Sequence, residues 1–341
     1  MATQKAAWLA TSYYLPTQKL TNTQLAIEFG DWGAAKILEK TGIAVRSIAH
    51  PDECASDLGV AAAEKLFATQ VCSPSEIDFL MFCTQTPDFF MPTTACLIQQ
   101  RLGLRTDCGA LDFNLGCSGF VYGLALAKSL IESGTAGKVL LITAETYSKF
   151  INPRDRSVRT IFSDAGAATL FDVLDSEDEL IGPFVFGTDG SGGQDLIVRA
   201  GAFRCPVNSE SDVEKMDRSG NWRSDKDLYM NGPEVFNFTL RAVPEALNNL
   251  LAKSGKCIAD IDYFIFHQAN KFMLDGLREK LGIPGDKFCI DLESYGNTVS
   301  STIPIALANA RRSEILKTGD LVAILGFGVG YSWAGALIRI T

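Results

Sequence analysis

The feature that most constrains the fold of this chain is a long internal repeat. Residues 76–86 (EIDFLMFCTQT) resemble residues 260–270 (DIDYFIFHQAN), because each segment has an acidic turn, a strand-like apolar run and then polar residues. Further helix-like and strand-like segments follow in the same order in both parts of the sequence, at an offset of roughly 180 residues. An ordinary alternation of helices and strands would give a similar pattern of apolar and polar segments, but it would not give a constant offset between them. We therefore interpret the chain as a duplicated α/β protein.

The paired segments divide the chain into two halves with a segment between them. The expected strand pairs are 109–114 with 288–293, 136–143 with 318–325, and 163–171 with 330–338. The boundaries that we predict are 1–173 for the N-terminal half, 174–228 for a bridging and inserted segment, and 229–341 for the C-terminal half. The middle segment is rich in Gly, Ser and charged residues, which is typical of a surface loop that borders a site.

Composition and charge exclude several classes of function. The net charge of −9 argues against a general polyanion binder, because phosphate contacts need clustered Lys and Arg. The N-terminus lacks the apolar core of a signal peptide, and no apolar stretch is long enough for a membrane span. The 9 cysteines form no C-x-x-C pair, which favours a reducing cytoplasm. We expect neither a bound metal nor a nucleotide-binding glycine loop, because neither spacing occurs.

One cysteine stands where the backbone is expected to turn sharply. Cys117, in the segment GCSG, follows the strand-like run 109–114 and precedes a helix-like run. A cysteine nucleophile reacts as its thiolate, and a helix N-terminus lowers the pKa of a cysteine. Gly116 and Gly119 would permit a tight turn and the close approach of a substrate. We therefore expect Cys117 to be a nucleophile. The alternative interpretation is that it is a buried cysteine that packs in a Gly-rich crossover between strand and helix.

Two further polar residues are expected to meet Cys117. His267 directly follows an apolar run, at the strand end where open α/β sheets place their ligands, and Asn297 is the repeat equivalent of Cys117. A pseudo-two-fold arrangement of the halves would bring all three together. The alternative interpretations are that His267 is a core histidine without a catalytic role and that Asn297 only caps the helix that follows it. His50, with proline and acidic neighbours, is expected in a surface loop.

This set of side chains is compatible with two kinds of chemistry. A neutral His and an Asn beside a reactive Cys suit the stabilisation of an oxyanion or enolate by hydrogen bonds. A cysteine hydrolase also uses Cys, His and Asn, with the His as base and the Asn as its orienting group. The sequence does not show that order of contacts. The segment GFGVG (326–330) is expected to form a tight turn that offers backbone N–H groups.

At this point the sequence resembles a known family, the β-ketoacyl-acyl carrier protein synthases III, which are thiolase-like condensing enzymes. The segments that carry the resemblance, in the same order along the chain, are YLPTQKLTN (14–22), KTGIAVRSIA (40–49), NLGCSGFVYGLALA (114–127), DRSVRTIFSDAGAATLF (155–171), MNGPEVF (230–236), FHQAN (266–270), GNTVSSTIP (296–304) and GFGVGYSWAGALIR (326–339). The resemblance implies a duplicated αβαβα fold of five layers and a homodimer.

The resemblance also implies roles for individual residues. Cys117 would accept the acyl group, and His267 with Asn297 would form the decarboxylation site. The residues implied for the oxyanion turn are Gly328, Val329 and Gly330, those for substrate contacts are Lys40, Arg156, Met230, Phe236, Ala269, Asn270 and Met91, and those for a carrier-protein patch are Lys271, Arg278 and Lys280. No cofactor is implied, since the substrates are thioesters of coenzyme A or acyl carrier protein.

The expected reaction is therefore a decarboxylative Claisen condensation of an acyl thioester with malonyl-acyl carrier protein, which initiates fatty acid synthesis. The chain departs from the family pattern at Lys40, which replaces an Arg, at Trp32, which lies four residues early, and at Val329 in the glycine turn. These departures favour a specialised condensing enzyme with a non-acetyl donor as the alternative. An acyl hydrolase or acyltransferase would not need His267 and Asn297 for decarboxylation, and a silent binding subunit would not need Cys117.

Overall fold

The chain folds around two mixed sheets of related strand order. The computed structural model describes residues 3–30 and 32–341. The first sheet has the order β1 (Thr3–Tyr14), β7 (Ala165–Ser176), β6 (Val139–Glu145), β4 (Phe79–Cys83), β5 (Gly109–Phe113). The second has the order β8 (Ile181–Thr188), β15 (Ser332–Arg339), β14 (Leu321–Gly328), β13 (Tyr263–Phe266). In each sheet two antiparallel strands at one side join parallel strands at the other.

The two sheets correspond strand by strand, which confirms the duplication. β1, β7, β6 and β4 of the first sheet match β8, β15, β14 and β13 of the second in position and direction. The prediction of a strand at 288–293 is wrong. In place of a strand, the structure has only an isolated parallel bridge between Phe264 and Phe288. The ladder stops there because the backbone N–H of Asp291 donates to the side-chain oxygen of Gln268 (2.7 Å) instead of to a strand.

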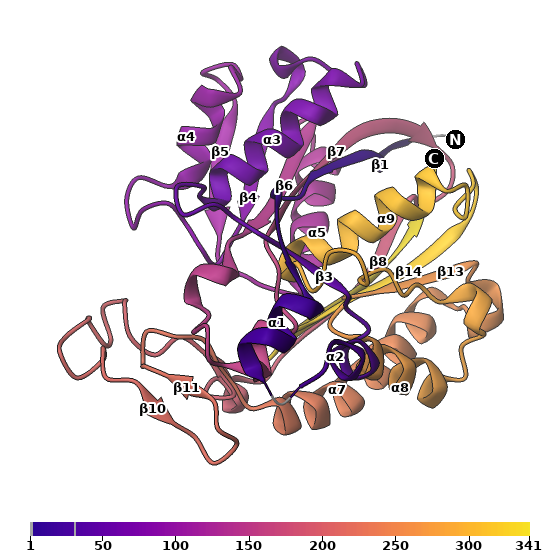
Figure 1. Cartoon of the computed structure of the whole chain (residues 1–341). Coiled ribbons are helices and arrows are strands. Elements are labelled where there is room, and N and C mark those ends of the chain that lie inside the picture. Colours follow the sequence, from indigo (N-terminus) through magenta and orange to yellow (C-terminus); the bar gives the residue numbers. More distant parts are fainter. Residues whose placement is uncertain (1–2, 31) are drawn as a thin grey trace.

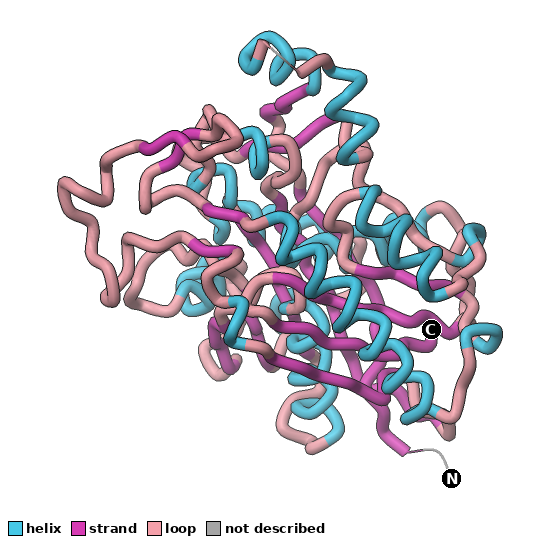
Figure 2. Tube along the Cα trace, turned by 90° about the horizontal axis from the view of Figure 1, so that it is seen from below, coloured by secondary structure: helices cyan, strands magenta, loops and turns pink. Residues whose placement is uncertain are grey.

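Helices fill the space between the sheets and cover both outer faces (Figures 1 and 2). α5 (Gly119–Glu132) and α9 (Thr302–Arg312) share one buried apolar cluster with residues of both sheets. α3 (Ala55–Ala68) and α4 (Thr94–Arg101) cover the outer face of the first sheet, and α7 (Gly232–Ser254) and α8 (Lys271–Leu281) cover that of the second. The order helix, sheet, helix, sheet, helix is the predicted five-layered αβαβα fold.

The remaining elements are short and lie at the periphery. The helices of this group are α1 (Asn22–Phe29), α2 (Ala34–Thr41) and α6 (Arg156–Arg159). Its strands form three pairs, β2 (Gln18–Thr21) with β3 (Val45–Ile48), β9 (Leu196–Ile197) with β12 (Tyr229–Met230), and β10 (Lys215–Met216) with β11 (Trp222–Arg223). The segment that carries β10 and β11 projects from the body (Figure 1). β8 lies in the second sheet, so the segment 174–228 contributes to the C-terminal half as well as to this projection. Among the described residues, no helix is long and apolar enough to cross a membrane.

Candidate active site

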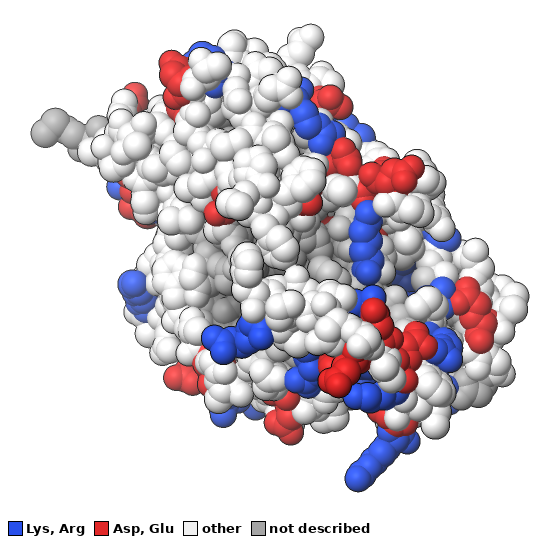
Figure 3. All heavy atoms as spheres, turned by 90° about the vertical axis from the view of Figure 1, so that its left-hand side faces the viewer, with Lys and Arg blue, Asp and Glu red and all other residues white. Residues whose placement is uncertain are grey.

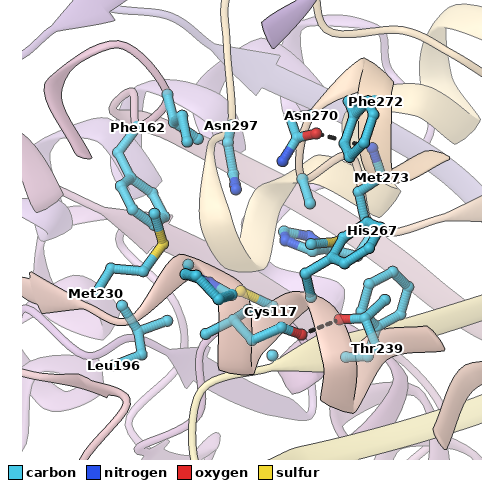
Figure 4. A pocket seen from close by; sticks show the side chains of 18 residues that line it. Cys117, Phe162, Leu196, Met230, Thr239, His267, Asn270, Phe272, Met273 and Asn297 are labelled. Carbon is cyan, nitrogen blue, oxygen red and sulfur yellow. Dashed lines mark hydrogen bonds between the residues drawn. The ribbon is translucent and has the colours of Figure 1, made fainter. Parts of the chain in front are cut away.

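A cavity of about 300 Å³ lies where the two halves meet. Cys117 comes from the turn before α5, His267 from the end of β13, and Asn297 from the loop that precedes α9. Figure 4 shows the three side chains turned toward the same space, with Phe162 and Met230 on one side and Phe272 and Met273 on the other. The structure thus brings together Cys117, its repeat equivalent Asn297, and His267, in a pocket with mainly apolar walls.

Cys117 is held at the start of α5 by close packing around it. The residue is 5% exposed, and the backbone N–H of Gly119 donates to the carbonyl of Gly116 (2.8 Å), which closes the turn. A Cβ atom on Gly116 would lie 2.5 Å from the side-chain oxygen of Gln85, and one on Gly119 would lie 2.3 Å from the sulfur of Cys83. The space that these glycines free is therefore filled by the protein itself, not by a substrate.

The resting thiol of Cys117 is neutral, which corrects the expectation of a lowered pKa. Burial raises the pKa of this thiol to about 12, the backbone N–H of Val329 offsets part of the rise, and the nearby carboxyl of Glu145 adds to it. Desolvation of a thiolate thus outweighs the helix N-terminus at this site. A nucleophilic attack by this thiol would therefore have to be coupled to loss of its proton.

The glycine turn after β14 lies directly against the sulfur. A Cβ atom on Gly328 would lie 2.8 Å from Sγ of Cys117, so that a side chain at this position would displace the thiol. The backbone N–H groups of Val329 and of Cys117 itself face the sulfur. These two N–H groups form the pair of donors that a tetrahedral oxyanion on an acylated Cys117 would need.

His267 is a buried neutral imidazole with one ring nitrogen already in use. It is 2% exposed, and burial lowers the pKa of its ring to about 3. Nδ1 lies 2.7 Å from the hydroxyl oxygen of Thr302, at the start of α9. The ring packs edge-on against Phe327. Nε2 is therefore the nitrogen that remains for a substrate.

Asn297 presents hydrogen-bond donors to the cavity. Its backbone is paired with the N-terminal half, since its N–H donates to Ile161 (3.0 Å) and its carbonyl accepts from Ser163 (2.9 Å). Its side-chain oxygen accepts the N–H of Val299 (2.9 Å). Because the oxygen is engaged in this way, the amide NH₂ group is the part left for a ligand.

The other predicted substrate contacts fall into two groups. Met230, Phe236, Ala269 and Asn270 line the cavity. Lys40 and Arg156 do not line it; both lie against Trp32, with the Lys40 nitrogen 4.8 Å and the Arg156 guanidinium 5.8 Å from the ring centre. Trp32 thus meets these two cations despite its shifted position in the sequence, because its ring lies along the face of α2 that carries Lys36 and Lys40. Met91 is 85% exposed and lies outside the cavity.

The three predicted carrier-protein contacts lie on α8, next to the cavity residue Phe272. Each of them has a partner within the chain: Lys271 pairs with Asp275, Arg278 with Glu279, and Lys280 with the carbonyl of Leu240 (2.8 Å). His50 is exposed and lies near Asp52, as expected for a surface loop.

Two features next to Cys117 are missing from the sequence-based prediction. The first is the fully buried carboxyl of Glu145, at the end of β6. The second is a larger cavity of about 820 Å³, whose lining includes Gln85, Tyr147 and Val329, and which shares Leu196 with the first cavity. Glu145 could have been found from the sequence, since it is an acidic residue that ends an apolar strand. The second cavity could not, because seven separate segments of the chain form it. Within the described residues, no group of three or more His, Cys, Asp or Glu side chains could hold a metal ion.

Comparisons with protein families match both halves of the chain. Residues 111–190 match the family described as 3-oxoacyl-[acyl-carrier-protein] synthase III, and residues 251–340 match the description of its C-terminal part. A relative named beta-ketoacyl-[acyl-carrier-protein] synthase III from Clostridium perfringens is 38% identical over 339 residues, which cover 99% of this chain and 100% of the relative. One of the same name from Caldanaerobacter subterraneus is 36% identical, over 98% of this chain and 97% of the relative.

Solved structures give the same result. A crystal structure of a 3-oxoacyl-(acyl-carrier-protein) synthase III is 53% identical, with a TM-score of 0.98, and the match covers 98% of this chain and 100% of that one. The enzyme of that name from Pseudomonas aeruginosa is 31% identical, with a TM-score of 0.85 and 98% of both chains covered.

Proposed function

The chain belongs to the 3-oxoacyl-[acyl-carrier-protein] synthase III family, and on that premise we propose that it condenses an acyl thioester with malonyl-acyl carrier protein and so initiates fatty acid synthesis. The observation that carries the proposal is the meeting of Cys117, His267 and Asn297 in one cavity between the halves. A cysteine alone suits many acyl transfers. Two neutral hydrogen-bond donors opposite it suit a reaction that develops an enolate.

In the first half-reaction Cys117 takes the acyl group. Its sulfur forms a bond to the thioester carbon, the bond to the donor sulfur breaks, and the thiol proton leaves with the released donor thiol. The backbone N–H groups of Cys117 and Val329 hold the oxyanion of the tetrahedral intermediate. Since the resting thiol is neutral, this coupled proton transfer is part of the barrier.

In the second half-reaction the malonyl thioester loses carbon dioxide and becomes an enolate. The Nε2–H of His267 and the NH₂ of Asn297 stabilise the negative oxygen. The enolate carbon then attacks the acyl carbon on Cys117, which releases the 3-oxoacyl product and a thiolate that takes up one proton. Burial favours this chemistry because a neutral imidazole donates a hydrogen bond without protonating the enolate.

We also propose that the enzyme is a cytoplasmic homodimer that binds acyl carrier protein near α8. Exposed apolar side chains gather beside the second cavity: Phe89 and Phe90 line it, Met91 is next in sequence, and Phe203 contacts the ring of Phe90 (5.5 Å). Such a cluster suits burial by a second copy of the chain. On the side that carries β10 and β11, mostly uncharged atoms surround a hollow near the centre, while charged side chains gather below it and at the right edge of the view (Figure 3). The cytoplasmic location is supported by cysteines that are all unpaired.

The second cavity favours one alternative, a specialised synthase with a donor larger than acetyl. Its volume of about 820 Å³ far exceeds the needs of a two-carbon group, and its wall at Gln85 and Val329 lies against the backbone of Gly116. In this variant of the function the condensation chemistry is unchanged, and only the acyl group differs.

Intact-protein mass spectrometry tests the proposal. The protein is exposed to a panel of acyl-coenzyme A and acyl-carrier thioesters, from acetyl to decanoyl, and then to malonyl-carrier protein. We expect an acyl adduct that is absent from Cys117→Ala and a 3-oxoacyl product after the second addition. An adduct that survives in Cys117→Ala refutes the nucleophile, and acylation without a 3-oxo product refutes condensation. The chain length that acylates fastest decides between acetyl and a larger donor.

A further inference from the structure

The loop that carries Asn297 has a strained backbone. Val299, two residues after Asn297, has a φ angle of 55°, in the left-handed region that β-branched residues avoid. The residue is fully buried, and its N–H donates to the side-chain oxygen of Asn297 (2.9 Å). Such strain persists only where the surroundings fix the backbone, and it occurs often at functional sites.

The surroundings that fix this turn belong to the other half of the molecule. Ser300 donates to one carboxyl oxygen of Glu145 (3.0 Å), and Ser301 donates to the carbonyl of Thr143 (2.9 Å). Both partners lie on β6, the central strand of the first sheet. The strained turn is therefore anchored across the boundary between the halves by two adjacent serines.

The other carboxyl oxygen of Glu145 is held just as firmly. It accepts the backbone N–H of Gln85 (3.0 Å) and lies within 3.4 Å of the hydroxyl groups of Thr84 and Thr86. The carboxyl group is fully buried, and the titratable groups that face it are Cys83, Cys117 and Tyr147. Glu145 therefore joins the loop after β4 to the turn after Asn297.

The same turn also determines the orientation of His267. The hydroxyl of Thr302 contacts both the carbonyl of Val299 (3.0 Å) and Nδ1 of His267 (2.7 Å). A shift of Val299 would thus move the donors of Asn297 and His267 together. We propose that Glu145 is a positioning residue, whose carboxyl group holds the turn 297–302 in the conformation that directs Asn297 and His267 at the substrate. This inference rests on the proposed function, in which those two residues stabilise the enolate.

The test separates the two half-reactions in four variants. Acylation of Cys117 is followed by mass spectrometry, and decarboxylation by release of carbon dioxide from malonyl-carrier protein. We expect Ser300→Ala and Glu145→Ala to slow decarboxylation by about tenfold or more, because small misplacements of positioned groups cost this much. Acylation should stay within about twofold in Ser300→Ala, which leaves the carboxyl group of Glu145 in place beside Cys117. Glu145→Gln keeps an acceptor for the N–H of Gln85 and turns its NH₂ group toward Ser300, whose hydroxyl can accept instead of donate, so it should restore decarboxylation.

A matched control is Thr169→Val, which removes a buried hydroxyl on β7 that pairs with Thr11 (3.0 Å) and not with any residue of the turn. It should leave both half-reactions unchanged. Normal decarboxylation in Ser300→Ala and Glu145→Ala overturns the proposal. An equal loss in both half-reactions, with no rescue by Glu145→Gln, also overturns it, because that pattern indicates general damage to the fold.

Hydrogen exchange tests the turn without any substrate. We expect the amides of residues 297–302 to exchange faster in Ser300→Ala than in the wild type and in Thr169→Val. Unchanged exchange contradicts the anchoring by Glu145, whatever reaction the enzyme catalyses. If exchange rises but the wild type condenses no malonyl thioester, then the proposed function fails while the anchoring stands.

Discussion

At the scale of single residues, the proposed nucleophile, Cys117, is a buried neutral thiol. Burial raises the pKa of Cys117 to about 12, so its ionised fraction should grow with pH across the whole range in which the fold is stable. We therefore predict that the rate of alkylation of Cys117 by iodoacetamide rises about tenfold per pH unit from pH 7 to pH 10. The measurement is peptide mass spectrometry after timed labelling.

The exposed Cys96 and Cys257 serve as internal references in the same digest. A plateau in the labelling of Cys117 at or below pH 8 would show a stable thiolate at rest. In that case the N–H groups of the glycine turn and of α5 would outweigh burial, and the proposed coupling of attack to proton loss would be wrong.

Thr302 should control which nitrogen of His267 carries the proton. Its hydroxyl has one hydrogen, which it can donate either to the carbonyl of Val299 (3.0 Å) or to Nδ1 of His267 (2.7 Å), but not to both. His267 can donate from Nε2 only while Nδ1 accepts, which requires the Thr302 hydrogen. We predict that Thr302→Val slows decarboxylation by about tenfold and that Thr302→Ser restores it. Nitrogen-15 NMR of the imidazole should show a mixture of tautomers in Thr302→Val alone; an unchanged tautomer contradicts the assignment.

At the scale of elements, the projection that carries β10 and β11 is fastened to the N-terminus of α6. Arg223 pairs with the fully buried carboxylate of Asp155 (2.8 Å), which also caps α6 through the N–H of Ser157 (2.9 Å). The neighbouring Arg156 donates to the carbonyl of Ser219 (3.0 Å). The projection therefore contacts the same segment that supplies a cation to Trp32.

We predict that Arg223→Ala lowers the free energy of unfolding by about 3 kcal/mol, because it leaves a buried carboxylate without its partner. Arg218→Ala, in the same turn, should change it by less than about 0.5 kcal/mol. Urea unfolding followed by circular dichroism measures both. Equal effects of the two substitutions would contradict a specific role for the pair of Arg223 and Asp155.

The repeat in the sequence predicted most of the elements but not all of them. Apolar runs at a constant offset predicted two corresponding sheets. A central strand is buried on both faces and is therefore apolar along its length, so each half of the chain shows the same apolar runs. The failure at 288–293 has a local cause: the side chain of Gln268 takes the N–H that would have continued the ladder. A contact between residues so far apart leaves no trace in the periodicity.

At the scale of the whole molecule, one buried carboxyl should shape the dependence of stability on pH. Burial raises the pKa of Glu145 from its ordinary value to about 8. In the unfolded chain this group ionises near pH 4.5, whereas in the folded chain it stays protonated up to about pH 8. The folded state thus binds more protons between these values, and its stability falls as the pH rises through this window.

We therefore predict that Glu145→Gln, which cannot ionise, has a higher Tm than the wild type at pH 8 but not at pH 4. The gain at pH 8 should be at least about 2 °C. Differential scanning calorimetry at the two pH values measures it. A constant difference between the proteins at both pH values contradicts a raised pKa.

The prediction of the site from the sequence succeeded where the chemistry depends on residue type, and it failed where the chemistry depends on packing. Cys117, His267 and Asn297 stand at ends of repeated elements, so that their meeting followed from the duplication. The pKa of Cys117 was predicted in the wrong direction, since the degree of burial is a property of the assembled halves. The contact of Trp32 with Lys40 and Arg156 and the anchoring of the turn by Glu145 depend on tertiary contacts that no spacing reveals.

The central claim is that one half of the molecule carries the acyl group while the other generates the enolate that accepts it. It is tested most directly in a single turnover, with enzyme that is acylated beforehand, freed of donor and mixed with malonyl-carrier protein. We predict that the acyl mass disappears from wild-type Cys117 and reappears in a 3-oxoacyl-carrier product. In His267→Ala and Asn297→Ala the acyl mass should remain on Cys117. Transfer at the wild-type rate in either variant would contradict the account.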